Sequence, residues 1–212
     1  MMRKVVFGIA FVFAGHAQAD QVVIAALGDS LTQGYGLPQE DGFVPQLQAW
    51  LDAKGADVQL INAGVSGDTT AGGLSRAAWT LTPDVDALIV TLGGNDLLRG
   101  IDPDASRSNL DGIMQAANSA DVEVLLIGME APGNYGPEYK NVFDAIYPEL
   151  AKKYNALHLN SFFDALLADG DTLADARPFM QNDGIHPNAD GVAKIVASIG
   201  PAVLALIDQT TN

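Results

Sequence analysis

The sequence contains no cysteine among its 212 residues. Disulfide bonds, thiolate metal sites and cysteine nucleophiles are therefore excluded, and the fold has to be held together by its hydrophobic core alone. A chain of this length is long enough to form one domain with a sizeable core.

Positive charge is also scarce. Lysine and arginine number 11 against 26 aspartates and glutamates, which gives a formal net charge of −15. A surface of this sign repels phosphate backbones and anionic lipid headgroups, so we expect no nucleic-acid partner. The acids are scattered along the chain, and we interpret them as a solvated, solubilising surface.

The apolar stretch near the N-terminus is too short to span a membrane. It covers residues 5–14, follows the basic pair Arg3 and Lys4, and precedes the small-residue motif Ala17-Gln18-Ala19. This pattern predicts a secretory signal peptide over residues 1–19, cleaved after Ala19. A short membrane anchor is the alternative, and the length disfavours it. We therefore expect a periplasmic or secreted mature chain, residues 20–212, with a net charge of −17 once Arg3 and Lys4 are removed and without stable membrane insertion.

Short runs rich in valine, isoleucine and leucine alternate with segments of helical periodicity. The apolar runs cover residues 22–27, 58–61, 87–92 and 122–128, with a weaker run at 156–159. Helical spacing is found in residues 43–51, 113–117, 143–150 (with Pro148 as a complication) and 189–207 (with Pro201 as a possible break). This alternation predicts an α/β fold in which helices cover both faces of a parallel sheet, in three layers. The segment expected to be the longest irregular region is 130–139, where proline and glycine cluster.

The tetrapeptide Gly28-Asp29-Ser30-Leu31 directly follows the first apolar run. Ligands bind at the carboxyl ends of strands in open α/β sheets, so the Ser30 hydroxyl is a candidate nucleophile. Such a serine requires a base, a group that orients the base, and donors for an oxyanion.

A base is available in Asp183-Gly184-Ile185-His186, ahead of the last helix. On one turn, residues three apart can meet, so Asp183 can hold one ring nitrogen of His186 while the other accepts the Ser30 proton. The other histidine of the mature chain, His158, lies in a strand-like run without an adjacent acid, and we expect it to be structural.

Two further strand ends offer oxyanion donors. Gly67 can expose a backbone N–H, and Asn95, after Gly93-Gly94, offers a neutral side-chain amide. Taken singly, either residue fits an ordinary turn equally well.

Other kinds of catalytic, metal-binding and phosphate-binding site fit this sequence poorly. The G-x-S-x-G elbow of α/β-hydrolases is not formed around Ser30 or Ser66, and Asp29 is expected to brace its loop rather than to act on the base. Asp169-Gly170-Asp171 lacks the later acids of a calcium loop, so we interpret it as a turn. Two distant histidines form no zinc site, and no phosphate-binding G-x-x-x-x-G-K-[ST] loop is present. We expect no metal ion or organic cofactor.

The ordered set of motifs resembles a known family. G-D-S-L, G-x-N-D and D-x-x-H-P place Ser30, Gly67, Asn95 and His186 in the order of the SGNH (GDSL) hydrolases. Residues 93–100, 134–136 and 145–151 are similar to the bacterial periplasmic thioesterase, lysophospholipase and arylesterase branch, whereas Met129-Glu130-Ala131 resembles its arylesterases most.

The resemblance implies a flavodoxin-like, five-stranded parallel sheet. It further implies Ser30 as nucleophile, Asp183 and His186 in support, and an oxyanion hole formed by the Ser30 N–H, the Gly67 N–H and the Asn95 side chain. The expected activity is hydrolysis of small carboxylic esters, and of acyl thioesters, through an acyl-enzyme. The sequence does not determine the oligomeric state, and we expect a monomer. A carbohydrate O-deacetylase on the same fold and a non-catalytic binding protein are the alternatives. Four residues beside the motifs are candidates for contact with an acyl group: Leu31, Leu97, Tyr135 and Ile185.

Overall fold

The computed structural model describes residues 21–167 and 175–210. Five parallel strands form one sheet in the order β2-β1-β3-β4-β5, which confirms the predicted fold class. The strands are β1 (Val22–Gly28), β2 (Val58–Gly64), β3 (Ala87–Thr91), β4 (Glu123–Ile127) and β5 (Leu157–Leu159). The predicted signal peptide and the Asp169-Gly170-Asp171 turn lie outside the described residues.

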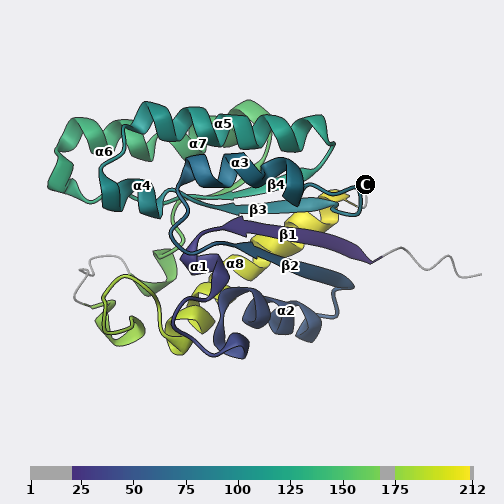
Figure 1. Ribbon diagram of the computed structural model, residues 1–212. Coiled ribbons are helices and arrows are strands. Elements are labelled where there is room, and N and C mark those ends of the chain that lie inside the picture. Colours follow the sequence, from purple (N-terminus) through teal and green to yellow (C-terminus); the bar gives the residue numbers. More distant parts are fainter. Residues whose placement is uncertain (1–20, 168–174, 211–212) are drawn as a thin grey trace, which may run out of the picture.

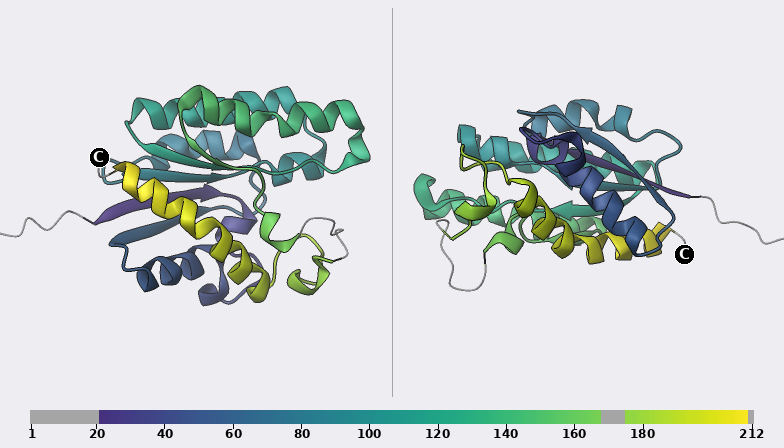
Figure 2. Two further views of the ribbon diagram at one scale, coloured as in Figure 1. Left: turned by 180° about the vertical axis from the view of Figure 1, so that it is seen from behind. Right: turned by 90° about the horizontal axis from the view of Figure 1, so that it is seen from below.

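Helices cover both faces of this sheet, as the alternating pattern predicts (Figure 1). One face carries α1 (Ser30–Gln33), α2 (Phe43–Ala53) and α8 (Ala189–Thr210). The other carries α3 (Thr70–Thr80), α4 (Gly94–Arg99), α5 (Pro103–Ser119), α6 (Pro137–Asp144) and α7 (Ile146–Tyr154). Seen from behind, α8 crosses its face of the sheet beside α2 (Figure 2).

The three central strands β1, β3 and β4 are almost fully buried, in line with their continuous apolar runs. The two outer strands are not. Ile61 of β2 is 38% exposed, and all three residues of β5 are half-buried. β2 and β5 are thus less buried than the three central strands, because an edge strand has a neighbouring strand on one side only.

Two helix predictions also need correction. The periodic segment 143–150 is divided between α6 and α7, and the break falls at Ala145. Pro148 has no N–H, so it fits the first turn of α7, where that group needs no partner inside the helix. The irregular region expected over residues 130–139 ends earlier than predicted, because α6 already begins at Pro137. Conversely, α8 continues through Pro201 without a break.

By length and composition alone α8 could cross a membrane. In the fold, however, one side of it is packed against the sheet and α2, with Ile195, Ile199 and Val203 fully or almost fully buried. Its apolar character is accounted for by this packing on the core.

The register of the sheet aligns the ends of the strands. Gly28 of β1 pairs with Gly64 of β2 and with Thr91 of β3, and Thr91 pairs with Ile127 of β4. The segments that follow these four strands therefore begin at one level, on one edge of the sheet. The polar residues predicted to react all come from this edge or from the loop before α8.

Candidate active site

Ser30 is the first residue of α1, and only Asp29 separates it from the end of β1. Asp29 caps this helix, because its Oδ1 accepts the backbone N–H of Leu31 at 3.0 Å. The helix packs so closely on the end of β1 that a Cβ at Gly28 would lie 2.0 Å from Thr32 Oγ1 and 2.9 Å from the carbonyl oxygen of Thr91. Only glycine at position 28 therefore allows the chain to turn and present Ser30 at the edge of the sheet.

His186 reaches Ser30 from the loop that precedes α8. Its Nε2 lies 2.8 Å from Ser30 Oγ, and its Nδ1 lies 2.7 Å from Asp183 Oδ2. The loop is held in place by Gln181, whose backbone N–H donates to the His186 carbonyl at 2.8 Å. The structure thus brings together the three side chains that the sequence singles out, although they are spread over more than 150 positions.

Asp183 is well suited to stay ionised beside the imidazole. In addition to the contact with His186, its Oδ1 accepts the backbone N–H groups of Ile185 at 2.9 Å and of His186 at 3.1 Å. The hydrogen bond from the His186 ring and that from the Ile185 backbone lower the pKa of Asp183 to about 2. A carboxylate in this position fixes the ring orientation and favours a positive charge on the imidazole.

Asp29 has a different role, as expected. It is 1% exposed, and its second oxygen, Oδ2, accepts a hydrogen bond from Asn95 Nδ2 at 3.2 Å. Burial raises the pKa of Asp29 to about 6, against the opposing effect of the hydrogen bonds from Leu31 and Asn95. Asp29 therefore braces the loop and ties the end of β1 to the start of α4.

The candidate oxyanion donors lie around the same space. Asn95 is in the first turn of α4, and its side-chain amide has a second N–H besides the one directed to Asp29. Gly67 adopts φ +84°, a left-handed conformation that favours glycine, in the loop after β2. Ser30, Gly67 and Asn95 all line one pocket.

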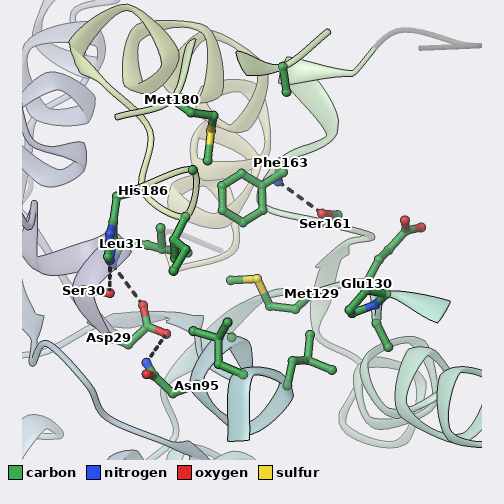
Figure 3. A pocket seen from close by; sticks show the side chains of 18 of the residues that line it. Asp29, Ser30, Leu31, Asn95, Met129, Glu130, Ser161, Phe163, Met180 and His186 are labelled. Carbon is green, nitrogen blue, oxygen red and sulfur yellow. Dashed lines mark hydrogen bonds between the residues drawn. The ribbon is translucent and has the colours of Figure 1, made fainter. Parts of the chain in front are cut away.

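This pocket has a volume of about 680 Å³ and a largely apolar wall (Figure 3). Leu31, Leu97, Tyr135 and Ile185 line it, so the structure places all four near Ser30. Their contact with a substrate stays a prediction. Leu31 and Leu97 are buried, whereas Tyr135 and Ile185 are 42% and 44% exposed and lie where solvent reaches the pocket.

Sequence reasoning missed much of the wall. Met129 follows β4, and Phe163, Leu166 and Met180 come from the connection between β5 and α8. Figure 3 shows Met129, Phe163 and Met180 across the cavity from Ser30 and His186. In its described parts this connection contains two short 3₁₀ turns, Asp164–Leu166 and Arg177–Phe179, and one isolated β-bridge between Met180 and Pro187. No periodic signal in the sequence could therefore have identified these residues.

Two tyrosines near the site were also missed. The Tyr35 ring lies 4.7 Å from the His186 ring, centre to centre, and lines the pocket. Tyr147, which the sequence marks only as an apolar helix position, is buried and donates its hydroxyl to the Leu92 carbonyl at 2.9 Å. Burial raises the pKa of Tyr147 well above its ordinary value. Its hydrogen bond fixes the chain just before Gly93-Gly94-Asn95.

His158 lies on β5 and is not among the residues that line the pocket, so the structure separates it from Ser30. Partial burial lowers the pKa of His158. Within residues 21–167 and 175–210, no three histidine, cysteine, aspartate or glutamate side chains gather in a way that could hold a metal ion.

The sheet order, the helices on both faces and the structural neighbours are those of the SGNH hydrolases. Residues 26–194 match the model of the GDSL-like Lipase/Acylhydrolase family, and the chain belongs to this family.

Several relatives cover most of the chain. Esterase TesA of Pseudomonas aeruginosa is 34% identical over 191 residues, which are 90% of this chain and 92% of that protein. Thioesterase 1/protease 1/lysophospholipase L1 of Escherichia coli K12 is 37% identical over 175 residues, 82% of this chain and 78% of that protein. The crystal structure of AlinE4, described as an SGNH-hydrolase family esterase, shares 42% identity with a TM-score of 0.72 and covers 89% of this chain and 98% of its own.

Proposed function

We propose that this chain is a serine esterase that works through an acyl-enzyme, with Ser30 as the nucleophile. The observation that carries the proposal is the unbroken line from Ser30 Oγ through His186 to Asp183, with contacts of 2.8 and 2.7 Å, at the mouth of an apolar pocket. Esterases of the same family, similar over nearly the whole chain, support it.

In the first half-reaction, Ser30 Oγ attacks the carbonyl carbon while its proton passes to His186 Nε2. Asp183 remains ionised and stabilises the imidazolium that forms. The negative charge on the carbonyl oxygen is received by the backbone N–H groups of Ser30 and Gly67 and by the free N–H of Asn95. Donors that are fixed in advance are effective here because they need no reorganisation as the charge develops.

The tetrahedral intermediate then collapses. The bond to the leaving group breaks, and His186 transfers its proton to the departing alkoxide or thiolate, which leaves as alcohol or thiol. In the second half-reaction, His186 takes a proton from water, and the resulting hydroxide attacks the acyl-enzyme. The acid is released and the proton returns to Ser30 Oγ. Every proton in this sequence is carried by the chain's own residues or by water.

The pocket indicates the substrate class. Its wall is formed largely by aliphatic and aromatic side chains, which fit an acyl chain better than a sugar ring, so the chemistry of the wall disfavours a carbohydrate O-deacetylase. Arylesterase and thioesterase are both printed names of relatives. Since the protein carries a formal net charge of −15, we propose that it hydrolyses uncharged carboxylic esters faster than anionic acyl-coenzyme A thioesters.

A covalent inhibitor tests the nucleophile directly. A phosphonofluoridate should form one adduct per chain on Ser30, with loss of fluoride, and should abolish hydrolysis of p-nitrophenyl butyrate. The pocket contains two other serines, Ser66 and Ser161, which serve as internal controls when the adduct is mapped by mass spectrometry. Ser30→Ala should remain folded and inactive, whereas Ser161→Ala should still be labelled. Labelling of Ser66 or Ser161, or full activity of Ser30→Ala, would refute the assignment.

We also propose that residues 1–19 direct export and that the mature protein is a monomer in the periplasm or the medium. N-terminal sequencing of protein purified from the periplasmic fraction should begin at Asp20. Light scattering of the purified protein should give the mass of a single chain. An uncleaved N-terminus in the membrane fraction would indicate an anchor instead.

A further inference from the structure

Arg76, in the middle of α3, connects the end of β1 with the end of β2 and the loop that follows β2. Its side chain is only 21% exposed. Nε donates to Asp68 Oδ2 at 2.7 Å, Nη1 to the Ala63 carbonyl at 2.5 Å, and Nη2 to the Gly28 carbonyl at 2.7 Å. All three nitrogens of the guanidinium group are therefore used in directed hydrogen bonds.

These acceptors belong to the two segments that carry backbone donors of the proposed oxyanion hole. The Gly28 carbonyl lies in the peptide bond that leads into Asp29, one residue before Ser30. Asp68 directly follows Gly67. The Gly28 carbonyl also accepts the backbone N–H of Val65 at 3.0 Å, so the loop after β2 and the end of β1 meet at this one oxygen.

The peptide bond between Gly67 and Asp68 is held at both ends by hydrogen bonds. The backbone N–H of Asp68 donates to the Val65 carbonyl at 3.1 Å, and the Gly67 carbonyl accepts from Arg99 Nη2 at 2.8 Å. Together with the Arg76 contact to the Asp68 side chain, these bonds restrict the turn at Gly67, where φ is +84°. The Gly67 N–H lies on the other side of this restricted residue, in the peptide bond from Ser66.

We infer that Arg76 is a positioning residue, which holds the backbone N–H groups of Ser30 and Gly67 at the spacing that the tetrahedral oxyanion requires. This inference rests on the proposed function. Arg76 is not among the residues that line the pocket, so it acts through Gly28 and Asp68 rather than on the substrate. Small displacements matter here, because oxyanion donors have to meet the developing charge within hydrogen-bond distance.

Only arginine suits this position. Its planar guanidinium presents donors in a rigid fork that can reach two carbonyls and a carboxylate at once. A lysine ammonium at the same place is a single point and cannot span all three acceptors. A glutamine is shorter and neutral and offers one donor group.

The same helix also supports the third donor. At the start of α3, the Thr70 hydroxyl donates to Asp96 Oδ1 at 2.6 Å and the Thr70 backbone N–H donates to Asp96 Oδ2 at 2.9 Å. Asp96 is the neighbour of Asn95 in α4. Helix α3 thus links the segments of Ser30, Gly67 and Asn95, with Arg76 responsible for the first two.

The test compares Arg76→Gln and Arg76→Lys with the parent enzyme on p-nitrophenyl butyrate. The concentration of active sites is determined by complete phosphonate labelling, so that kcat refers to folded, competent molecules. We expect Arg76→Gln to lower kcat by about 10- to 100-fold, less than the loss of a whole oxyanion donor, with KM changed by less than about 3-fold. Arg76→Lys should fall between Arg76→Gln and the parent. The rate of phosphonylation should decrease in parallel with kcat, because it depends on the same donors.

Arg107→Gln is the matched control. It removes the same charge from an exposed ion pair with Glu149, in which the Arg107 Nη1 to Glu149 Oε2 distance is 2.6 Å, away from the pocket. We expect its kcat to equal that of the parent. An unchanged kcat per labelled site in Arg76→Gln, or an effect on KM alone, overturns the inference. If Arg76→Gln does not fold, Arg76→Lys decides by the same criterion. Failure of the proposed function would be recognised separately, by a parent enzyme that is not labelled at Ser30.

Discussion

The pocket has two regions that are built in different ways. Its proposed reacting end is formed by Ser30, Gly67, Asn95 and His186, which line the pocket, together with Asp183, which is hydrogen-bonded to His186. These polar groups lie at aligned strand ends or in the loop before α8. The side chains of Ser30, Asn95, Asp183 and His186 are each held by a hydrogen bond of 2.7 to 3.2 Å. Its apolar wall comes from the segments that follow β4 and β5. This wall presents apolar side chains to the cavity: Met129, Phe163, Leu166 and Met180.

We infer that the reacting end carries out the chemical step and that the apolar wall decides which acyl chains bind. Hydrogen bonds are directional, so the reacting end tolerates little displacement before its donors miss the developing charge. Apolar contacts are not directional, and a wall of flexible methionine and leucine side chains can accept chains of several shapes. We therefore expect substitutions at the reacting end to change kcat, and substitutions in the wall to change KM in a manner that depends on acyl length.

The largest effect is expected for Asn95→Ala. This change removes a proposed oxyanion donor, so kcat on p-nitrophenyl butyrate should fall by about 10²- to 10³-fold with little change in KM. Asn134→Ala is the control, because Asn134 lines the same pocket from the 3₁₀ turn Gly133–Tyr135. It should retain kcat within about 3-fold. A loss confined to KM in Asn95→Ala would remove Asn95 from the oxyanion hole.

Asp29 makes the stability of the reacting end depend on pH. Burial raises the pKa of Asp29 to about 6 from an ordinary value of 3.8, so between these values the folded protein binds a proton that the unfolded chain has lost. This contribution is fully present below about pH 4 and is lost as pH rises through about 6. Relative to Asp29→Asn, the free energy of unfolding of the parent should therefore decrease by about 2 kcal/mol between pH 4 and pH 7.

Urea denaturation of both proteins at several pH values measures this difference. Parallel stability curves for the parent and Asp29→Asn would contradict the raised pKa of the buried Asp29 side chain.

A smaller effect is expected for Tyr147→Phe. The change leaves the buried Leu92 carbonyl without its 2.9 Å hydrogen bond, which should lower the free energy of unfolding by about 1–2 kcal/mol. Tyr154→Phe, on the same helix, removes a hydroxyl that bonds to the partly exposed Asp111 at 3.0 Å. Its effect should be about 0.5 kcal/mol or less. An equal decrease in the free energy of unfolding in the two variants would show that the hydrogen bond from Tyr147 to Leu92 contributes no more stability than the bond from Tyr154 to Asp111.

The smallest effect tests the apolar wall. Met180→Ala removes apolar contact area across the cavity from Ser30, so KM for p-nitrophenyl octanoate should rise by about 3- to 10-fold while kcat remains unchanged. The shorter butyrate ester should be almost unaffected. If both esters respond equally, Met180 does not contact the acyl chain, and the division between the two regions of the pocket fails.

Much of the reacting end can be predicted from the sequence, for physical reasons that differ by residue. Asp183 and His186 are three positions apart, so a single turn suffices to bring them together. Ser30 and Asn95 directly follow or lie near the ends of strongly apolar runs, and parallel strands deliver such ends to one edge. For Tyr147 the sequence reveals less. Its helical spacing predicts a buried position but not the hydrogen bond from its hydroxyl to the Leu92 carbonyl.

Helix α3 shows a second limit. Its buried positions are Thr70, Gly73 and Ala77, which are small or polar and produce no hydrophobic periodicity that predicts a helix. Arg76 consequently looks like an ordinary surface cation in the sequence, whereas the fold surrounds it with the carbonyls of Gly28 and Ala63 and the Asp68 carboxylate.

The sequence by itself determined the five strands of the sheet, several of the helices between them, and the residue types that could react. These depend on local periodicity and on motifs that need only a strand end or one turn. The tertiary structure alone decided which strands lie at the edges, where Arg76 anchors the loops, and which side chains form the apolar wall. Those features depend on contacts between segments far apart in the chain, and neither burial nor hydrogen bonding across such distances leaves a regular pattern in the sequence.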